Sequence, residues 1–342
     1  MVLRSPRARV SLRVDGRSVA VACVLLATLV AVMAVTLTTG DFKLSLGEVI
    51  AALTGHAEGG ADFIVNTLRL PRLLTGVFAG AALAVSGSIM QSLSRNPLGS
   101  PDIIGFTNGS ATGALIVIIV LHGSVAQIAA GALAGGIATA VTVYLLAFAG
   151  GVQGFRFILV GIGVSAMLLA ANSYLITRAT WQDALAAQAW LIGTLNGRGW
   201  DQALLVGIAL AVLLPIVLYY GRGLAMLEMG DDVAKALGVG VEHTRLMLIG
   251  VSVALAAIAT AATGPVWFIA FAAPHLVSRL TRATGPGLLP CAIMGALLLA
   301  ASDLAVQRVF ASAQLPVGTA TGTIGGLYLI WLLASEWRRG RA

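Results

Sequence analysis

The sequence contains few charged residues. Only 10% of its 342 residues are charged, whereas 58% are hydrophobic, and the net charge is +7. Soluble domains of ordinary composition carry about a quarter charged residues. The chain also lacks the hydrophilic block, on the order of 100 residues, that a second soluble domain would need. These two absences exclude a soluble protein and predict a single membrane domain over residues 18–337.

The chain also lacks the residue clusters on which catalysis and metal binding depend. Its histidines and cysteines are scattered without metal-ligand spacing: His56, His122, His243, His275, Cys23 and Cys291. No GxSxG elbow is present, nor a pair of carboxylates at catalytic spacing. We therefore expect a protein that is not an enzyme and that binds no metal or cofactor.

Only two lysines occur, Lys43 and Lys235, and neither follows a glycine. A phosphate-binding P-loop needs a lysine directly after glycine, so this chain does not bind and hydrolyse ATP in that manner by itself. If ATP drives it, another polypeptide supplies the ATPase. A nucleic-acid partner is also excluded, because it would need a basic, aromatic-studded soluble surface.

Long apolar runs fill most of the chain. A helix that crosses the hydrocarbon core needs about 20 mostly apolar residues, and alternating strand patterns are absent, so we predict an all-α polytopic membrane protein with about ten transmembrane helices. The predicted spans are 18–38, 73–93, 106–121, 125–149, 157–177, 203–220, 246–263, 266–278, 288–306 and 321–337. The third and the eighth are short and are interrupted by Gly, Thr, Asn or Pro.

The basic residues orient these spans. An even number of spans puts both termini on one side, and segments 1–17 and 338–342 are rich in arginine. The positive-inside rule then places both termini in the cytoplasm. Few of the 21 basic residues are left outside: Lys43, Arg69, Arg72, Arg178, Arg198 and Arg308. We interpret 18–38 as a retained helix and not a signal peptide, because no cleavage motif follows it.

The longest polar stretch on the predicted outer side, 41–72, ends in Arg69-Leu-Pro-Arg72. Pro71 suits a helix start, where its missing N–H costs nothing. Two arginines one turn apart form an outward cationic patch on the side where basic residues are disfavoured, which favours contact with an acidic partner. The alternative interpretation is that these side chains snorkel to the membrane interface.

The predicted inner loop 221–244 contains a second candidate site. Asp231 or Asp232 can cap a short helix through Ala236, which Gly238 would end. Such a helix is too polar to span and too apolar for a free loop, so we predict a docking element for a soluble partner. The alternative is an amphipathic helix that lies on the lipid surface.

Asp303 is the clearest ionisable residue within a predicted span. Ionisable residues inside a membrane are costly and are commonly functional, so Asp303 could carry protons in a secondary transporter. We favour a structural carboxylate that pairs with Arg308 or caps a neighbouring helix, because no second buried acid is available to relay a proton.

A weak internal similarity relates two parts of the chain. Segments 83–87 and 260–264 each end in glycine, and Pro97 and Pro274 follow ten residues after those glycines. We predict that each half contains a small-residue helix end followed by a proline break, as in transporters with broken helices.

Several motifs, taken in order, resemble the FecCD-type permeases of ATP-driven importers for iron–siderophore complexes, haem and vitamin B12. They are Arg69-Leu-Pro-Arg72, Gly80-Ala-Ala-Leu-Ala-Val-Ser-Gly87 with Gln91, Asn96-Pro-Leu-Gly-Ser-Pro101, Phe268 with Pro274-His275, Leu289-Pro290 with Gly295-Ala296, and Pro316-Val-Gly318 with Thr321 and Gly325. The resemblance covers about residues 20–337. It implies the fold of the vitamin B12 importer, with two permease subunits side by side and the cargo path along their interface.

The resemblance also implies partners and site residues. A binding protein outside would meet Arg69 and Arg72, and two cytoplasmic ATPase subunits, which use the ATP, would meet the coupling segment with Asp231, Asp232, Ala234, Leu237 and Gly238. A third docking arginine of the family falls at Gln307 here, with Arg308 one residue later. Gln314 replaces the family's glutamate before Leu-Pro, and such departures fit a member that pairs with a different permease chain.

The cargo class implied by the resemblance is an iron–siderophore complex, since Ala-Pro-His followed by Arg279 is more similar to the siderophore members. Two alternatives remain open. One is a vitamin B12 or haem importer; the other is a proton-coupled secondary transporter that uses Asp303.

Overall fold

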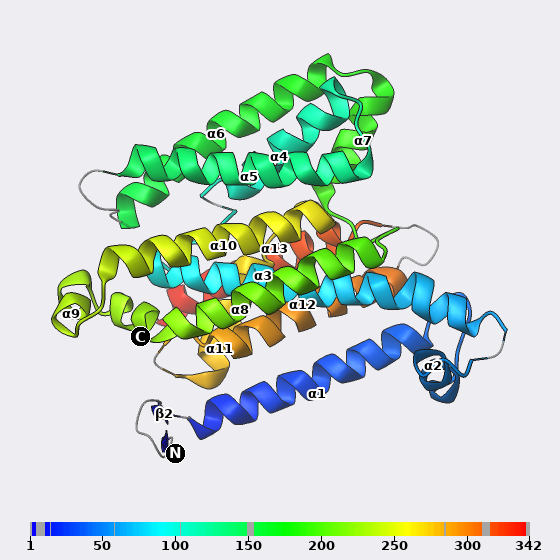
Figure 1. The fold of residues 1–342 in the computed structure, drawn as a ribbon, viewed down its shortest axis with the longest axis horizontal. Coiled ribbons are helices and arrows are strands. Elements are labelled where there is room, and N and C mark those ends of the chain that lie inside the picture. The colour runs from blue at the N-terminus through cyan, green and yellow to red at the C-terminus, as the bar shows by residue number, and fades with distance from the viewer. Residues whose placement is uncertain are drawn as a thin grey trace.

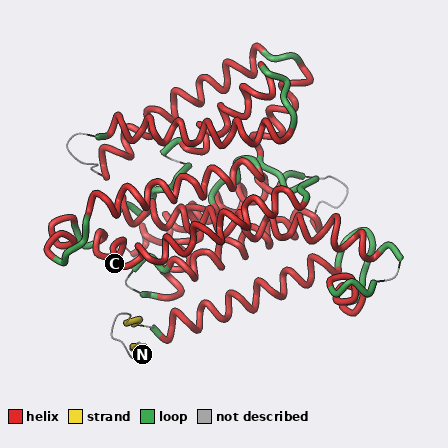
Figure 2. The backbone as a smooth tube through the Cα atoms, viewed as in Figure 1, coloured by secondary structure: helices red, strands yellow, loops and turns green. Residues whose placement is uncertain are grey.

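The computed structural model describes residues 2–4, 11–13, 15–57, 59–102, 104–148, 154–283, 285–309 and 315–339 (Figures 1 and 2). Parts of the predicted basic termini, and Gln314, lie outside the described residues. A short antiparallel pair, β1 (Val2–Arg4) and β2 (Ser11–Arg13), precedes the helices. All the other secondary-structure elements of the described chain are helices, which confirms the predicted all-α class.

Seven helices of the described residues are long and apolar enough to cross a membrane. They are α1 (Gly16–Thr38), α3 (Leu70–Ser94), α5 (Val125–Ala147), α6 (Gly154–Arg178), α8 (Trp200–Glu228), α10 (Val241–Thr263) and α12 (Leu288–Val309). The remaining three predicted spans correspond to α4 (Phe106–Leu115), continued by the π-helical η2 (Ile116–Val120), to α11 (Ile269–Thr281) and to α13 (Val317–Arg339). The chain is a multi-pass membrane protein.

Three short helices lie in predicted loops: α2 (Leu46–Leu53), α7 (Trp181–Ile192) and α9 (Asp231–Ala236). Of these, only α9 was predicted. A capping box starts α2, where the Ser45 hydroxyl accepts a hydrogen bond from the Glu48 amide and the Glu48 carboxylate accepts one from the Ser45 amide. With 8, 12 and 6 residues, these helices are too short for a search based on apolar runs of about 20 residues to find them.

The helices form layers around α3 and α10 (Figure 1). Inside the molecule 83% of the α3 span is buried and 67% of the α10 span, against 11% for α6 and 17% for α1. Helices α4 to α7 form the upper layer in Figure 1, and α1 lies on the opposite side of the centre. The peripheral helices therefore present their apolar side chains outward, as lipid-facing helices do.

Glycine lets the central helices approach each other closely. Gly80 of α3 and Gly295 of α12 face each other so closely that a Cβ on either residue would overlap the other's carbonyl oxygen. A Cβ at Gly87 of α3 would likewise overlap the carbonyl oxygen of Ala270 in α11. Small residues at helix contacts are the usual means of tight packing in membranes, so these positions act in packing, as the sequence indicates.

The helix ends differ from the prediction in two places. The π-helical η1 (Phe63–Arg69) runs directly into α3. Pro71 therefore lies in the first turn of α3 but does not begin a separate helix, because the chain is already helical before it. The hydrogen-bond register changes from π to α at this point. Helix α8 continues to Glu228 instead of ending near residue 220, because Leu224 and Leu227 pack inside the molecule. The inner loop is shorter than predicted.

In the first half, the predicted helix end at Gly87 is wrong, but the predicted break at Pro97 is confirmed, because Pro97 lies in the non-helical segment between α3 and α4. Gly87 is an interior residue of α3, and the chain remains helical to Ser94. In the second half, Gly264 does end α10, but Pro274 lies within α11 and does not interrupt it. The shared spacing of glycine and proline therefore corresponds to two different structures.

Candidate docking and coupling sites

The two predicted sites lie at opposite ends of the helices. The η1–α3 junction with Arg69 and Arg72 is next to α2, whereas α9 lies at the other end, together with β2 and the end of α13 (Figure 1). The two ends of the chain therefore share the end at which α9 lies.

Arg69 holds the start of α3 against the end of α1. Its guanidinium donates one hydrogen bond to the carbonyl oxygen of Leu37, at 2.6 Å, and another to that of Phe42, at 2.5 Å. A side chain that saturates two backbone carbonyls across a loop is fixed in orientation. Arg69 therefore has a structural role of its own, which the sequence pattern did not indicate.

Arg72 is paired with Asp303. The Arg72 Nη2 lies 2.7 Å from Asp303 Oδ1, and its Nε lies 3.0 Å from Oδ2. Gln307 donates a third hydrogen bond to Oδ2, at 2.6 Å. The Asp303 side chain is 4% exposed and that of Arg72 is 24% exposed. Both carboxylate oxygens therefore accept hydrogen bonds, and part of the arginine stays open to solvent.

The predicted pairing of Asp303 with Arg308 is wrong. The two residues are five apart on α12, which places them on different faces, because side chains meet at spacings of three or four. Gln307, four residues on, does meet Asp303. Arg308 is exposed on the last turn of α12.

The predicted short helix at the other end is present as α9. It spans Asp231–Ala236, and Gly230 and Gly238 flank it with positive φ of 120° and 84°. The predicted helix-capping role is wrong, since Gly230 occupies the N-cap position and no side chain caps the helix. The carboxylate of Asp231 instead contacts Arg245 and Arg95.

The side chains of this segment divide into an inward and an outward set. Ala234 is fully buried and packs with Leu227 and Val241. Three apolar side chains in or beside α9 are exposed: Met229 is 61% exposed, Val233 44% and Leu237 56%. Exposed apolar side chains of this kind make the segment a candidate contact surface. The sequence pattern pointed to Leu237 but missed Met229 and Val233.

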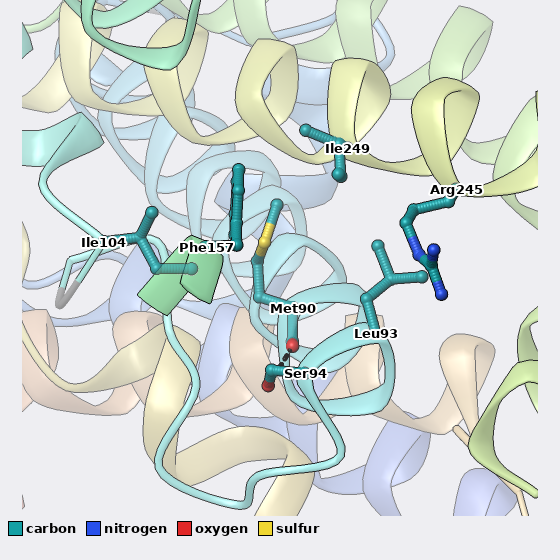
Figure 3. Close-up of a pocket in the computed structure, with 7 residues that line it drawn as sticks. All are labelled: Met90, Leu93, Ser94, Ile104, Phe157, Arg245 and Ile249. Atoms are coloured by element: carbon teal, nitrogen blue, oxygen red, sulfur yellow. Dashed lines mark hydrogen bonds between the residues drawn. The ribbon is translucent and has the colours of Figure 1, made fainter. Parts of the chain in front are cut away.

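A small pocket lies next to this segment, between α3, α6 and α10. Figure 3 shows Arg245 at its edge, with Met90, Ile104, Phe157 and Ile249 around it. Its volume is about 10 Å³, which is about the space that one water molecule requires. It is too small to hold a cargo molecule in this structure.

The fold and the two sites define a transport protein built from apolar helices. The chain belongs to the FecCD transport family, whose pattern matches residues 26–335. It is 43% identical over 325 residues to the ferric enterobactin transport system permease protein FepG of Escherichia coli K12, covering 95% of this chain and 98% of that one. It is 35% identical to the achromobactin transport system permease protein CbrC of Dickeya dadantii, covering 90% and 88%.

A solved structure shares the fold. An inward-facing conformation of a metal-chelate type ABC transporter superposes with a TM-score of 0.83 at 28% sequence identity, covering 92% of this chain and 99% of that one. Family membership and the permease fold, both predicted from the ordered motifs, are thereby confirmed.

Proposed function

We propose that this chain is the membrane-spanning permease subunit of a binding-protein-dependent ABC importer for iron–siderophore complexes. It pairs with a second permease subunit, and the cargo passes along their interface. The proposal is supported by the ferric enterobactin and achromobactin permeases among the relatives and by the metal-chelate transporter that shares the fold. The chain itself carries out no bond-breaking step.

The observation on which the proposal chiefly rests is the α9 segment. Met229, Val233 and Leu237 are exposed, while Ala234 anchors the segment to the permease. Exposed apolar side chains beside charged Asp232 and Lys235 suit contact with a soluble protein better than burial in lipid. We assign this surface to a cytoplasmic ATPase, which supplies the ATP hydrolysis that this chain lacks. Both termini and α9 then face the cytoplasm, and the protein resides in the inner membrane.

We assign the end with Arg69, Arg72 and Arg308 to the substrate-binding protein outside. An acidic group on that protein could approach the open edge of Arg72 and the exposed Arg308. Arg69 contributes its charge from a fixed position, since its hydrogen bonds go to backbone carbonyls. Charge complementarity of this kind mainly sets orientation and association rate.

Two experiments test the proposal. The first is co-purification, which should recover an ATPase and a second permease. The second is uptake of ferric enterobactin by cells in which an uncoupler abolishes the proton gradient while ATP is maintained. Uptake should continue. A collapse under these conditions contradicts an ATP-driven importer and favours a proton-coupled transporter.

The alternatives predict different results. A vitamin B12 or haem importer would take up cobalamin or haem and not the iron complex. A proton-coupled transporter would lose coupling when Asp303 is replaced by Asn. The two hydrogen bonds from Arg72 and one from Gln307 to Asp303 favour a structural role for this carboxylate.

A further inference from the structure

The carboxylate of Asp231 lies between two guanidinium groups from two other helices. Arg245 of α10 donates from Nη2 to both carboxylate oxygens, at 2.8 Å each. Arg95, at the C-cap of α3, donates from Nη2 to Oδ1. One residue at the start of α9 is thus ion-paired with both of the central helices of the molecule.

Both arginines are themselves held in place. The side chain of Arg245 is only 8% exposed, so its charge depends on the acceptors around it, since a buried charge without a partner is costly. Arg95 adopts a left-handed backbone with φ of 47°, and its Nε donates to the carbonyl oxygen of Leu227 in α8, at 2.9 Å. The ion pairs therefore connect α9 to α3, α8 and α10.

The backbone on either side of α9 adds little stiffness of its own. The helix has only six residues, and the glycines that flank it, Gly230 and Gly238, have wide conformational freedom. Among the described side chains, Ala234 packs α9 on its neighbours and Asp231 ties it by charge. A rotation of α9 would pull directly on Arg95 and Arg245.

The connection continues into the centre of the molecule. The loop after Arg95 contains Pro97, whose carbonyl oxygen contacts His275 Nε2 of α11 at 3.0 Å. Further along the central helices, the hydroxyls of Ser86 in α3 and Ser252 in α10 lie 2.8 Å apart in a buried contact. Helices α3 and α10 are therefore joined to each other and to the α9 end.

We infer that Asp231 is a positioning residue, which through Arg95 and Arg245 transmits movement of α9 to α3 and α10 during transport. The inference rests on the proposed function, in which α9 meets the ATPase. It differs from a docking role, because the carboxylate of Asp231 then acts on this chain's own arginines and not on the ATPase surface.

The experiment uses the complete transporter in proteoliposomes, with its ATPase, partner permease and binding protein, and with ferric enterobactin as the probe. Asp231→Asn is compared with Glu242→Gln. Glu242 also accepts a hydrogen bond from Arg245, at 3.2 Å, but it lies on the same helix and is exposed. The control therefore removes a negative charge beside Arg245 without cutting the link between helices.

For Asp231→Asn we expect the ATPase to co-purify at the wild-type level, while iron complex imported per ATP hydrolysed falls about tenfold, a typical size for coupling between sites. Glu242→Gln should keep the wild-type ratio, and Asp231→Glu should restore most of it. An unchanged ratio in Asp231→Asn overturns the inference. Loss of the ATPase from the purified complex also overturns it, because Asp231 would then be a docking residue.

If Asp231→Asn does not accumulate in the membrane, Arg95→Gln serves instead. The Arg95 side chain is 44% exposed, and Arg245 still holds Asp231 in this variant, so the protein should fold. The amount of iron complex imported per ATP hydrolysed should fall, but less than in Asp231→Asn. An unchanged ratio in this variant overturns the inference as well. If the wild-type protein shows no ATP-dependent uptake, the proposed function is wrong. If the wild type does import and the variant imports as much iron complex per ATP as the wild type, only the inference about Asp231 is wrong.

Discussion

Arg72 and Asp303 are 231 residues apart in the sequence, yet they form a two-point ion pair that joins α3 to α12. Further along the same two helices, Gly80 and Gly295 make the close backbone contact. The charge pair and the glycine contact together fix how α12 lies on the most buried helix of the subunit. The pair thus connects the partly exposed Arg72 to α12.

Replacing Asp303 with Asn should destabilise the protein by about 1–3 kcal/mol, because Arg72 and Gln307 would keep their positions around a group that accepts less well. The measurement is thermal unfolding in detergent. Asp201→Asn is the control, since Asp201 is exposed in the first turn of α8, and it should change stability far less. Equal effects of the two variants would contradict a structural role of the ion pair.

Replacing Gly295 with Ala should be costly despite the small change. The added Cβ would overlap the carbonyl oxygen of Gly80 and the side chain of Ala84, and forcing apart well-packed helices costs about 1–3 kcal/mol. Gly250→Ala in α10 is the matched control, because a Cβ there meets no atom. It should be neutral or stabilising by up to about 1 kcal/mol. Thermal unfolding of the two variants compares them, and the prediction fails if Gly295→Ala is as stable as the control.

The fold was largely predictable, because hydropathy alone reports whether a segment can cross a membrane. The residues with which the charged side chains pair could not be predicted from the sequence. Asp231 contacts Arg95, 136 residues away, and Arg245, 14 residues away, and no local pattern encodes such pairs. Closeness in sequence favours an ion pair between Asp303 and Arg308. Helical geometry instead places Arg308 on another face of α12, and tertiary packing places Arg72 of α3 next to Asp303. The exposed Met229 and Val233 were missed because their apolar character resembles that of the adjoining span.

The ion pairs of Asp231 should depend on pH in a defined direction. Partial burial alone would raise the pKa of Asp231, but the hydrogen bonds and charges of Arg245 and Arg95 outweigh it and hold that pKa below its ordinary value. A carboxyl group whose pKa is lower in the folded state than in the unfolded state stabilises the fold at any pH above its unfolded-state pKa, which is about 3.9. This stabilisation is lost as the pH falls through the folded-state pKa. The difference in Tm between wild type and Asp231→Asn should therefore stay constant from about pH 8 to about pH 5 and shrink below about pH 4. A difference that already shrinks between about pH 7 and about pH 5 would contradict the lowered pKa.

The sidedness of the two sites can be measured with single cysteines. Val233 is 44% exposed on α9 and Trp181 is 75% exposed at the start of α7, and these helices lie at opposite ends of the molecule (Figure 1). In a background with Cys23 and Cys291 replaced by Ser, a membrane-impermeant maleimide should label Trp181→Cys in spheroplasts and Val233→Cys only in inverted vesicles. Each variant is the control for the other. The reverse pattern would place α9 outside and remove the ATPase from its proposed position, whereas labelling of both from one side would contradict the spanning arrangement itself.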